Sequence, residues 1–263
     1  MKRVRTWLSG IAPAVGFGVF AASTATAQVI DEELFALEAE IEALAARFPA
    51  FAYFPWTDDN EDTAFLYGDS KGLVHYFVSE GGRLREKWKS FPLDGTIKEV
   101  FGADLNNNGV PEIVAYTSSG RIYVWATGKF ELLWESVEEK FTAIQAMAIA
   151  DVDRDPNLEI IVCADNKLLY FDGVEFFREK EGRDFFDPIE MLIADVDGDL
   201  EDEIVTSDGY VVDTNSLNIE WATDGFGYPI SLFDIDNDGV LEVVGQIGGA
   251  LTFWDVEDRR EIW

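Results

Sequence analysis

The stretch Asp234-Ile-Asp236-Asn-Asp238-Gly-Val-Leu-Glu242 places oxygen-bearing side chains at positions 1, 3, 5 and 9 of a short loop, directly before an apolar run. Three earlier stretches share this pattern: Asp104-Leu-Asn106-Asn-Asn108-Gly-Val-Pro-Glu112, Asp151-Val-Asp153-Arg-Asp155-Pro-Asn-Leu-Glu159 and Asp195-Val-Asp197-Gly-Asp199-Leu-Glu-Asp-Glu203. Oxygens at these spacings can converge on one hard cation such as Ca²⁺, which takes about 6–8 oxygen ligands. The sequence therefore predicts a repeat protein with up to four calcium loops.

The four loops recur at a period that is typical of solenoids and propellers. Their first aspartates, at 104, 151, 195 and 234, are 47, 44 and 39 residues apart. Around the loop at Asp151, short β-rich runs occupy 147–149, 160–163 and 167–171, and a last run ends on an aromatic residue, Phe177. The last runs of the other units end at Trp134, Trp221 and Trp263. Four strands per unit are typical of a propeller blade, so we expect an all-β fold, a β-propeller of about five four-stranded blades.

The fifth blade is a degenerate unit that precedes the four loops. Aligning Gly72 with Gly120 places its loop positions at Trp56, Asp58, Asn60 and Ala64. Two of the four oxygens are missing, so we expect this blade to hold no metal. Five units then fill residues 49–263, either as a closed ring or as a partial, open propeller.

The N-terminus has the pattern of a secretory signal peptide. Basic residues at 2, 3 and 5 precede an apolar stretch over 7–22, and Ala25-Thr26-Ala27 offers small residues to signal peptidase. We expect residues 1–27 to be removed near Ala27 and the mature chain, periplasmic or secreted, to begin at Gln28. An uncleaved anchor is the alternative, but the stretch is short for a span of about 20 apolar residues and contains Gly, Pro and Ser.

Residues 28–48 predict an amphipathic helix, capped by Asp31 and ended by Pro49. Its apolar seam has the spacing 4-3-4-3-4 and consists of Ile30, Leu34, Leu37, Ile41, Leu44 and Phe48. The seam either packs on the rim of the propeller or forms a coiled-coil contact with another chain. Its many glutamates disfavour a parallel self-pair, so a protein partner reached through residues 31–48 would be a different chain.

The formal net charge of −31 excludes nucleic acid and an anionic membrane surface as direct partners. A basic partner and a high-salt habitat are both compatible with this charge.

Catalytic patterns are weak. There is no Gly-rich phosphate loop and no Cys/His cluster. The single histidine, His75, fits an ordinary strand position, and Cys163 fits a buried, inert thiol without a disulfide partner. We therefore expect a non-catalytic protein-interaction scaffold, with a carbohydrate-binding or polysaccharide-cleaving propeller as the alternative. Exposed Trp56, Trp125 and Trp254 would favour sugar stacking, whereas Trp88, Trp134, Trp221 and Trp263 are expected to pack at blade-strand ends.

The four loops differ in quality. Aspartates in a turn can also simply accept hydrogen bonds from their own backbone. The loop at Asp234 is the strongest metal candidate because it has Gly239 at position 6, while the loop at Asp104 carries two amides and should bind more weakly. Position 6 is Pro156 or Leu200 in the other two loops, and neither readily takes the positive φ that Gly allows. An EF-hand is excluded because position 12 carries no Glu in any loop.

The D-x-[DN]-x-[DN]-G-x-x-E loop followed by a β-hairpin resembles the FG-GAP/VCBS repeat, the blade unit of integrin α-subunit propellers and of many secreted bacterial proteins. The resemblance covers about residues 50–263. It implies Ca²⁺ in loops on one face of a propeller, with extracytoplasmic adhesion or scaffolding as the common use. The chain departs from the family in having about five blades where integrins have seven, Glu in place of Asp at position 9, and no Gly at position 6 in two loops.

Overall fold

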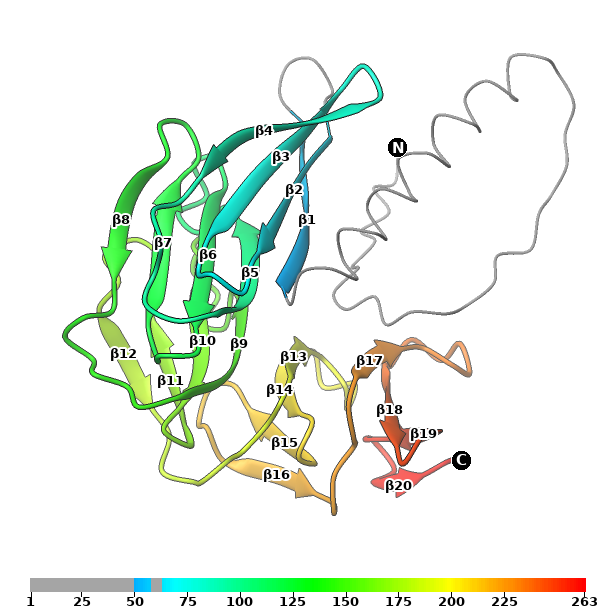
Figure 1. Ribbon diagram of the computed structural model, residues 1–263. Coiled ribbons are helices and arrows are strands. Elements are labelled where there is room, and N and C mark those ends of the chain that lie inside the picture. The colour runs from blue at the N-terminus through cyan, green and yellow to red at the C-terminus, as the bar shows by residue number, and fades with distance from the viewer. Residues whose placement is uncertain (1–49, 58–62) are drawn as a thin grey trace, which may run out of the picture. The chain divides into compact units, whose positions relative to one another are not determined.

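The computed structural model describes residues 50–57 and 63–263, which form twenty β-strands in five sheets (Figure 1). Each sheet contains four antiparallel strands that are neighbours in the order of the chain. The predicted signal peptide, residues 1–27, and the predicted helix, residues 28–48, lie outside the described residues. Within the described part of the chain, no helix has the length and hydrophobicity that a membrane span requires.

The sheets are numbered here in chain order. Sheet 1 consists of β1 (Ala50–Thr57), β2 (Thr63–Gly68), β3 (Val74–Glu80) and β4 (Arg83–Lys89). Sheet 2 consists of β5 (Ile97–Ala103), β6 (Glu112–Thr117), β7 (Ile122–Ala126) and β8 (Glu131–Glu135). Sheet 3 consists of β9 (Ile144–Ala150), β10 (Glu159–Ala164), β11 (Lys167–Phe171) and β12 (Arg178–Glu181). Sheet 4 consists of β13 (Met191–Ala194), β14 (Glu203–Thr206), β15 (Tyr210–Asp213) and β16 (Ile219–Ala222). Sheet 5 consists of β17 (Ile230–Phe233), β18 (Glu242–Ile247), β19 (Ala250–Asp255) and β20 (Arg260–Glu261).

The four-strand repeat read from the sequence is confirmed. The predicted run 160–163 lies in β10 and the run 167–171 is β11. The expectation that the last run of this unit ends at Phe177 is wrong, because β12 begins only at Arg178 and Phe177 lies before it with an exposed ring.

Burial decreases from the second strand of each sheet to the fourth. All six residues of β6 and of β10 are buried, as expected for apolar strands that are covered on both faces. The fourth strands are largely exposed and polar, as in the sequence Arg-Leu-Arg-Glu-Lys-Trp-Lys of β4. In sheets 1 to 4 the register shifts within this outer strand, so that one extra residue bulges out of the ladder.

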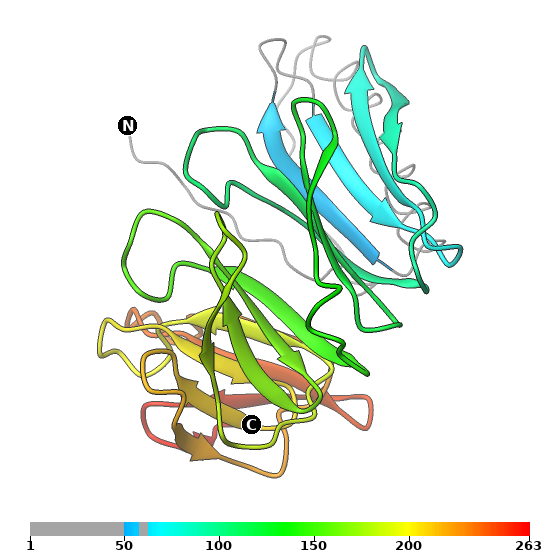
Figure 2. The same ribbon diagram turned by 90° about the vertical axis from the view of Figure 1, so that its left-hand side faces the viewer.

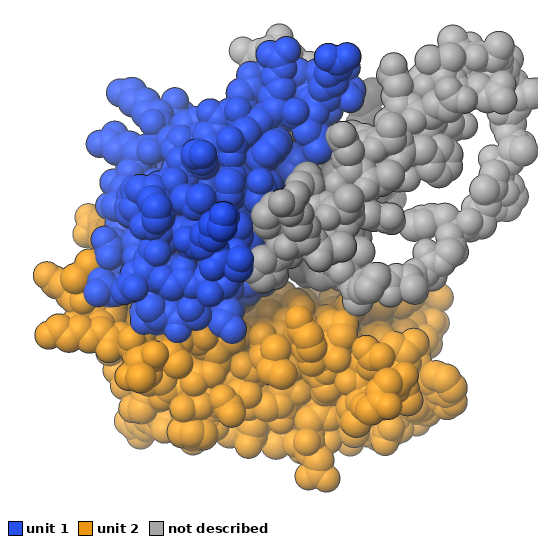
Figure 3. Space-filling model, viewed as in Figure 1, with its two compact units in different colours: residues 1–102, 111–136 blue, residues 103–110, 137–263 orange. Residues whose placement is uncertain are grey.

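The described chain separates into two compact units (Figure 3). Unit 1 comprises residues 1–102 and 111–136, and its described core lies between sheets 1 and 2. Leu66 and Val74 of sheet 1 pack there with Ile113 and Trp125 of sheet 2.

Unit 2 comprises residues 103–110 and 137–263 and contains sheets 3, 4 and 5. In Figure 2 these sheets lie one behind another, coloured from green through yellow to red. Ile161 and Cys163 of sheet 3 pack against Ile204 and Val212 of sheet 4. The opposite face of sheet 4, including Val205 and Val211, packs against Ile230 and Val243 of sheet 5.

The expectation that Trp263 packs at a blade-strand end is wrong. Its side chain is 74% exposed because β20 ends at Glu261, two residues earlier. The Trp263 carbonyl accepts a hydrogen bond from the Phe253 N–H, and the two rings lie 5.5 Å apart. One side of the indole therefore contacts sheet 5 and the other faces solvent.

Candidate metal centres

Every predicted calcium loop occupies the same place in its sheet, between the first strand and the second. The loops at Asp104, Asp151, Asp195 and Asp234 lead into β6, β10, β14 and β18. The Glu at position 9 is the first residue of the second strand in all four cases, and it is buried. The sequence repeat is thus a structural repeat.

The buried Glu at position 9 ties the end of the loop to its start. In three loops its Oε2 accepts a hydrogen bond from the backbone N–H of position 2. The pairs are Val152 to Glu159 at 2.9 Å, Val196 to Glu203 at 3.0 Å and Ile235 to Glu242 at 2.7 Å. One carboxylate oxygen of each Glu is thereby fixed in place, and the other can face the loop.

The Asp at position 1 accepts hydrogen bonds from backbone N–H groups further along its loop. In three loops the position 6 N–H donates to it, from Gly109 to Asp104, Leu200 to Asp195 and Gly239 to Asp234. The loop at Asp151 lacks this bond because Pro156 has no N–H. There the Asp151 carboxylate accepts from Arg154 instead, at 2.7 Å.

Positions 3 and 5 form Asx turns, the alternative that the sequence left open. Asp236 accepts from the Asp238 N–H at 3.2 Å, and Asp238 accepts from the Val240 N–H at 2.9 Å. The loops at Asp151 and Asp195 have the same two bonds at positions 3 and 5. In the loop at Asp104, Asn108 at position 5 accepts the corresponding bond from the Val110 N–H. The aspartates accept these bonds through Oδ1, so their turns are compatible with a cation on Oδ2, whereas the single side-chain oxygen of Asn108 already accepts a bond in its turn.

The backbone of the loops corrects one expectation. Leu200 adopts a positive φ of 74°, although a Leu was not expected to do so readily. Its side chain is 86% exposed, so no packing opposes this conformation, and its N–H bond to Asp195 stabilises it. Position 4 has a positive φ in all four loops, where the residues are Asn107, Arg154, Gly198 and Asn237.

The loops bring carboxylates close together. In each of three loops, oxygens of three acidic side chains lie within 4.8 Å of one another. The groups are Asp151, Asp153 and Glu159; Asp195, Asp197 and Asp199; and Asp234, Asp236 and Glu242. Positions 1, 3 and 9 therefore meet in two loops, and positions 1, 3 and 5 meet in the third.

The loop at Asp234 fits a hard cation best. Among the described residues, Asp234 Oδ1 is a buried oxygen without a hydrogen-bond partner. It belongs to one of the three-carboxylate groups, so a cation would supply the missing interaction. Carboxylate oxygens are also the ligands that Ca²⁺ prefers.

The electrostatics of the loops favour a cation as well. Burial raises the pKa of Glu159 to about 7 and that of Glu203 to about 8, although each accepts a backbone hydrogen bond that lowers it. The neighbouring loop aspartates raise both pKa values further. Burial also raises the pKa of Glu242. A bound divalent ion would reverse this effect, because an opposite charge stabilises the ionised form.

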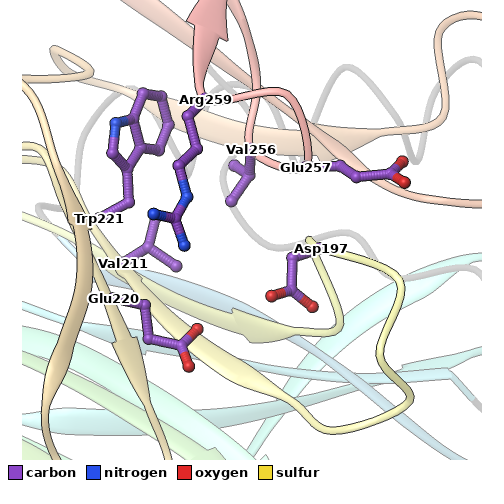
Figure 4. Close-up of a pocket in the computed structure, with 7 residues that line it drawn as sticks. All are labelled: Asp197, Val211, Glu220, Trp221, Val256, Glu257 and Arg259. Carbon is purple, nitrogen blue, oxygen red and sulfur yellow. The ribbon is translucent and has the colours of Figure 1, made fainter.

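Sequence reasoning missed one residue of these centres. Oxygens of Glu220, from β16, lie within 4.8 Å of oxygens of Asp197 and Glu203. Figure 4 shows Glu220 and Asp197 on the wall of a cavity of about 80 Å³, with the Arg259 guanidinium beside Trp221. Glu220 is the bulge residue of its strand, and Glu179 is the bulge residue of β12. The position of Glu220 beside the loop depends on its bulge, which no local pattern in the sequence indicates.

The loop at Asp104 and the degenerate unit offer fewer carboxylates than the other three loops. In the loop at Asp104, Oδ1 of Asp104 accepts from the Asn108 N–H at 3.0 Å, and Asn106 supplies an amide at position 3. In the degenerate unit, residues 58–62 lie outside the described residues. Ala64, its position 9, is buried in β2 and offers no side-chain oxygen.

His75 and Cys163 occupy strands, as predicted. His75 lies in β3, where its Nδ1 is 2.5 Å from a Glu86 oxygen and its ring stacks on Tyr67. Cys163 is fully buried in β10, and burial raises the pKa of its thiol to about 12. A thiol with this pKa is a poor nucleophile at neutral pH.

The tryptophans that would indicate sugar stacking give little support to it. Trp125 is 1% exposed and packs in the core of unit 1. Trp254 is partly buried and packs with Trp221 and Phe226. The side chain of Trp56 lies outside the described part of the structure.

No protein-family model and no curated protein matches this sequence. Solved structures share its fold. The chain superposes on BBS1N, from a complex with ARL6DN, with a TM-score of 0.60 and 12% identity, covering 83% of this chain and 68% of that one. For the Vibrio cholerae biofilm matrix protein Bap1 the TM-score is 0.59, with 17% identity over 82% of this chain and 39% of Bap1. For the Neurospora crassa Pan2 WD40 domain it is 0.58, with 16% identity over 82% of this chain and 64% of that one.

The chain thus spans less than two thirds of the Bap1 and Pan2 chains. At these identities the likeness shows the fold alone, which is that of a β-propeller protein.

Proposed function

We propose that the chain is an exported, calcium-binding β-propeller of the FG-GAP/VCBS type, with about five blades, which acts as a non-catalytic protein-interaction or adhesion scaffold. The observation that carries the proposal is the repeated convergence of three carboxylates at the same place in sheets 3, 4 and 5. Like charges are costly to hold this close, and their recurrence is readily explained if a cation compensates them.

The calcium part has a sharp test, because the Asx turns allow charge to be changed without changing the hydrogen bond. Asp236→Asn keeps an Oδ1 acceptor for the Asp238 N–H and removes one charge from the best loop. Asp213→Asn is the matched control, since Asp213 accepts the Ser216 N–H in a hairpin turn and belongs to none of the three-carboxylate groups among the described residues.

We expect millimolar Ca²⁺ to raise the melting temperature relative to EDTA, because the ion binds the folded loops. Asp236→Asn should reduce this gain and remove or weaken one binding site in the calorimetric titration, whereas Asp213→Asn should leave the gain and the number of sites unchanged. Asn106→Ala, in the loop that carries two amides, should reduce the calcium-induced gain in melting temperature less than Asp236→Asn does. Identical melting curves in EDTA and in Ca²⁺ would leave only the Asx-turn interpretation.

The proposed scaffold role is supported by the fold and by the small size of the cavities, which suits a small-molecule site poorly. The two cavities found at the loops have volumes of about 80 and 200 Å³, below the roughly 300–1,000 Å³ of typical small-molecule sites. Of the fold neighbours, BBS1N was crystallised in complex with ARL6DN, and Bap1 is a biofilm matrix protein. Co-purification from the native envelope in Ca²⁺ and in EDTA tests this part. A calcium-dependent protein partner supports it, and retention by polysaccharide alone contradicts it.

Export is proposed from the leader pattern. N-terminal sequencing of the exported chain should return Gln28 as the first residue. A chain that still begins at Met1 would refute cleavage.

A further inference from the structure

The outer strand of sheet 1 is basic in a strongly acidic chain. β4 has the sequence Arg83-Leu-Arg-Glu-Lys-Trp-Lys89, and its four cations are all exposed. The other outer strands carry no net positive charge, with Glu-Leu-Leu-Trp-Glu in β8, Arg-Glu-Lys-Glu in β12, Ile-Glu-Trp-Ala in β16 and Arg-Glu in β20. β4 therefore differs in sign from the strands at the same place in the other sheets.

The change of sign extends over most of sheet 1. Residues 63–102 contain six Lys or Arg against five Asp or Glu, whereas residues 103–263 contain ten against 36. At physiological salt, exposed charges more than about 8 Å apart are largely screened from each other. A partner at β4 therefore meets this local charge rather than the net charge of the whole chain.

The cations of β4 are only partly neutralised by their neighbours. Arg85 Nε lies 3.4 Å from a Glu80 oxygen, and Lys87 pairs with the same carboxylate. Among the described residues, neither Arg83 nor Lys89 has an ion-pair partner. Much of the positive charge of β4 is thus available to another molecule.

β4 is also an open edge. It is the last strand in the order of sheet 1, so its outward N–H and C=O groups face no neighbouring strand in the described part of the chain. It has seven residues, against two to five in the other outer strands. Trp88, which is partly buried, stacks on Phe130 at 4.9 Å and places an apolar surface beside the cations. An extended polypeptide can add to such an edge through its backbone and be selected through its side chains.

Protection of the edge alone does not explain the sign of the charge. Charged residues on an edge strand prevent pairing between copies. Acidic residues would repel another copy equally well, and Glu131 and Glu135 occupy the outer strand β8. Positive charge is explained if the edge attracts an acidic segment. A polypeptide fits this edge better than a nucleic acid or a polysaccharide does, because its extended backbone offers donors and acceptors at the spacing of a strand.

We infer that β4 is a docking strand for an acidic, extended segment of a partner protein. The segment pairs with the free edge of β4 and places its carboxylates beside Arg83, Arg85 and Lys87. This surface serves the scaffold role proposed above, on which the inference rests. It is separate in sequence from the calcium loops, which lie within residues 104–242.

A labelled peptide of about ten residues with alternating Val and Glu is the probe, and fluorescence anisotropy measures its binding to the full chain. Because each charge reversal turns an attraction into a repulsion, we expect the double variant Arg85→Glu, Lys87→Glu to bind about tenfold more weakly. The matched control is Lys71→Glu, an exposed position in the turn between β2 and β3, which should bind like wild type. Equal binding by the double variant and wild type would overturn the inference.

The titrations are run in EDTA and in Ca²⁺, and the affinity of the probe should be the same in both. A missing calcium response in the melting curves would then count against the calcium loops and leave the result for β4 standing. High salt should weaken binding of the probe, because its contacts are between exposed charges.

Changes in the probe keep the test independent of how the variants fold. A probe with Lys in place of Glu should not bind, and methylation of alternate backbone nitrogens should weaken binding because it removes the donors that pair with β4. Equal binding of the Glu and Lys probes, or of the methylated and unmethylated probes, would contradict an acidic strand at this edge. Sedimentation of the wild-type chain gives the remaining check. Oligomers at low salt that the double variant abolishes would show that a second copy covers β4, and the inference would fail.

Discussion

The backbone N–H of Val196 donates a hydrogen bond of 3.0 Å to Oε2 of Glu203, a buried carboxylate seven residues later in the chain. Glu159 and Glu242 make the same bond in their loops. The Glu at position 9 therefore has a structural role besides any role as a ligand, and the two can be separated by substitution.

Glu203→Gln should separate them. The Gln Oε1 can still accept from Val196, and the neutral amide removes the charge whose burial raises the Glu203 pKa to about 8. In EDTA at neutral pH we expect Glu203→Gln to melt no lower than wild type, but to lose part of the calcium-induced gain. Glu203→Ala should melt lower in both conditions, because a buried N–H left without a partner costs about 1–3 kcal/mol. Thermal melts of the three chains check this, and equal calcium gains for Gln and Glu would refute a ligand role.

Glu190 provides a test of pH dependence away from the loops. Its carboxylate accepts a 2.9 Å hydrogen bond from the Ile230 N–H, which links sheet 4 to sheet 5. Burial raises its pKa, and the hydrogen bond lowers it by less. A raised folded-state pKa gives stability that is fully present below the unfolded value of 4.5 and is lost as the pH rises through the folded value.

Glu190→Gln should therefore stabilise the protein at pH 7.5 and change little near pH 4, because Gln mimics the protonated acid. Each kcal/mol would appear as a rise of about 2–4 °C in melting temperature for a chain of this size. The exposed Glu131→Gln is the matched control. A Glu190→Gln difference that is the same at both pH values would contradict the assignment.

Arg154 and Glu201 connect two neighbouring loops by an ion pair of 3.0 Å, in which Arg154 is exposed and Glu201 is partly exposed. Exposed pairs contribute about 0–1 kcal/mol, so Arg154→Gln should hardly change the melting temperature in EDTA. Removing the positive charge should instead tighten calcium binding by the loop at Asp151. This increase in calcium affinity should be smaller at high salt, because salt screens charges separated by more than about 10 Å at 0.1 M. Calorimetric titrations at low and high salt check this, with Arg183→Gln as control, and weaker binding by Arg154→Gln would contradict it.

The repeat could be predicted from sequence because its signals are local. The run Ile160–Cys163 became the centre of β10, and the Asp-rich loops fell between first and second strands, since apolar alternation and turn residues act over a few positions. Glu220 could not be placed in this way, because its approach to Asp197 depends on a bulge in an outer strand more than 20 residues later. The positive φ of Leu200 was also missed, because a hydrogen bond to Asp195 and open solvent outweigh the usual preference of a Leu.

Cys163 allows loop binding and sheet opening to be measured together. Its thiol is fully buried between sheets 3 and 4, four residues after the loop that ends at Glu159, and burial raises its pKa to about 12. In the folded chain at pH 8, we expect no fast reaction with a thiol reagent such as DTNB, and one equivalent of reacted thiol after unfolding in guanidinium.

Because labelling of Cys163 requires the sheets to open, Ca²⁺ should slow the labelling by the factor 1 + [Ca²⁺]/Kd if the ion binds only the closed form. Asp153→Asn should remove much of this protection while keeping the Asx acceptor for the Asp155 N–H. Fast labelling of the native chain would refute the burial, and a rate that is the same in Ca²⁺ and in EDTA would refute binding by the loop next to it.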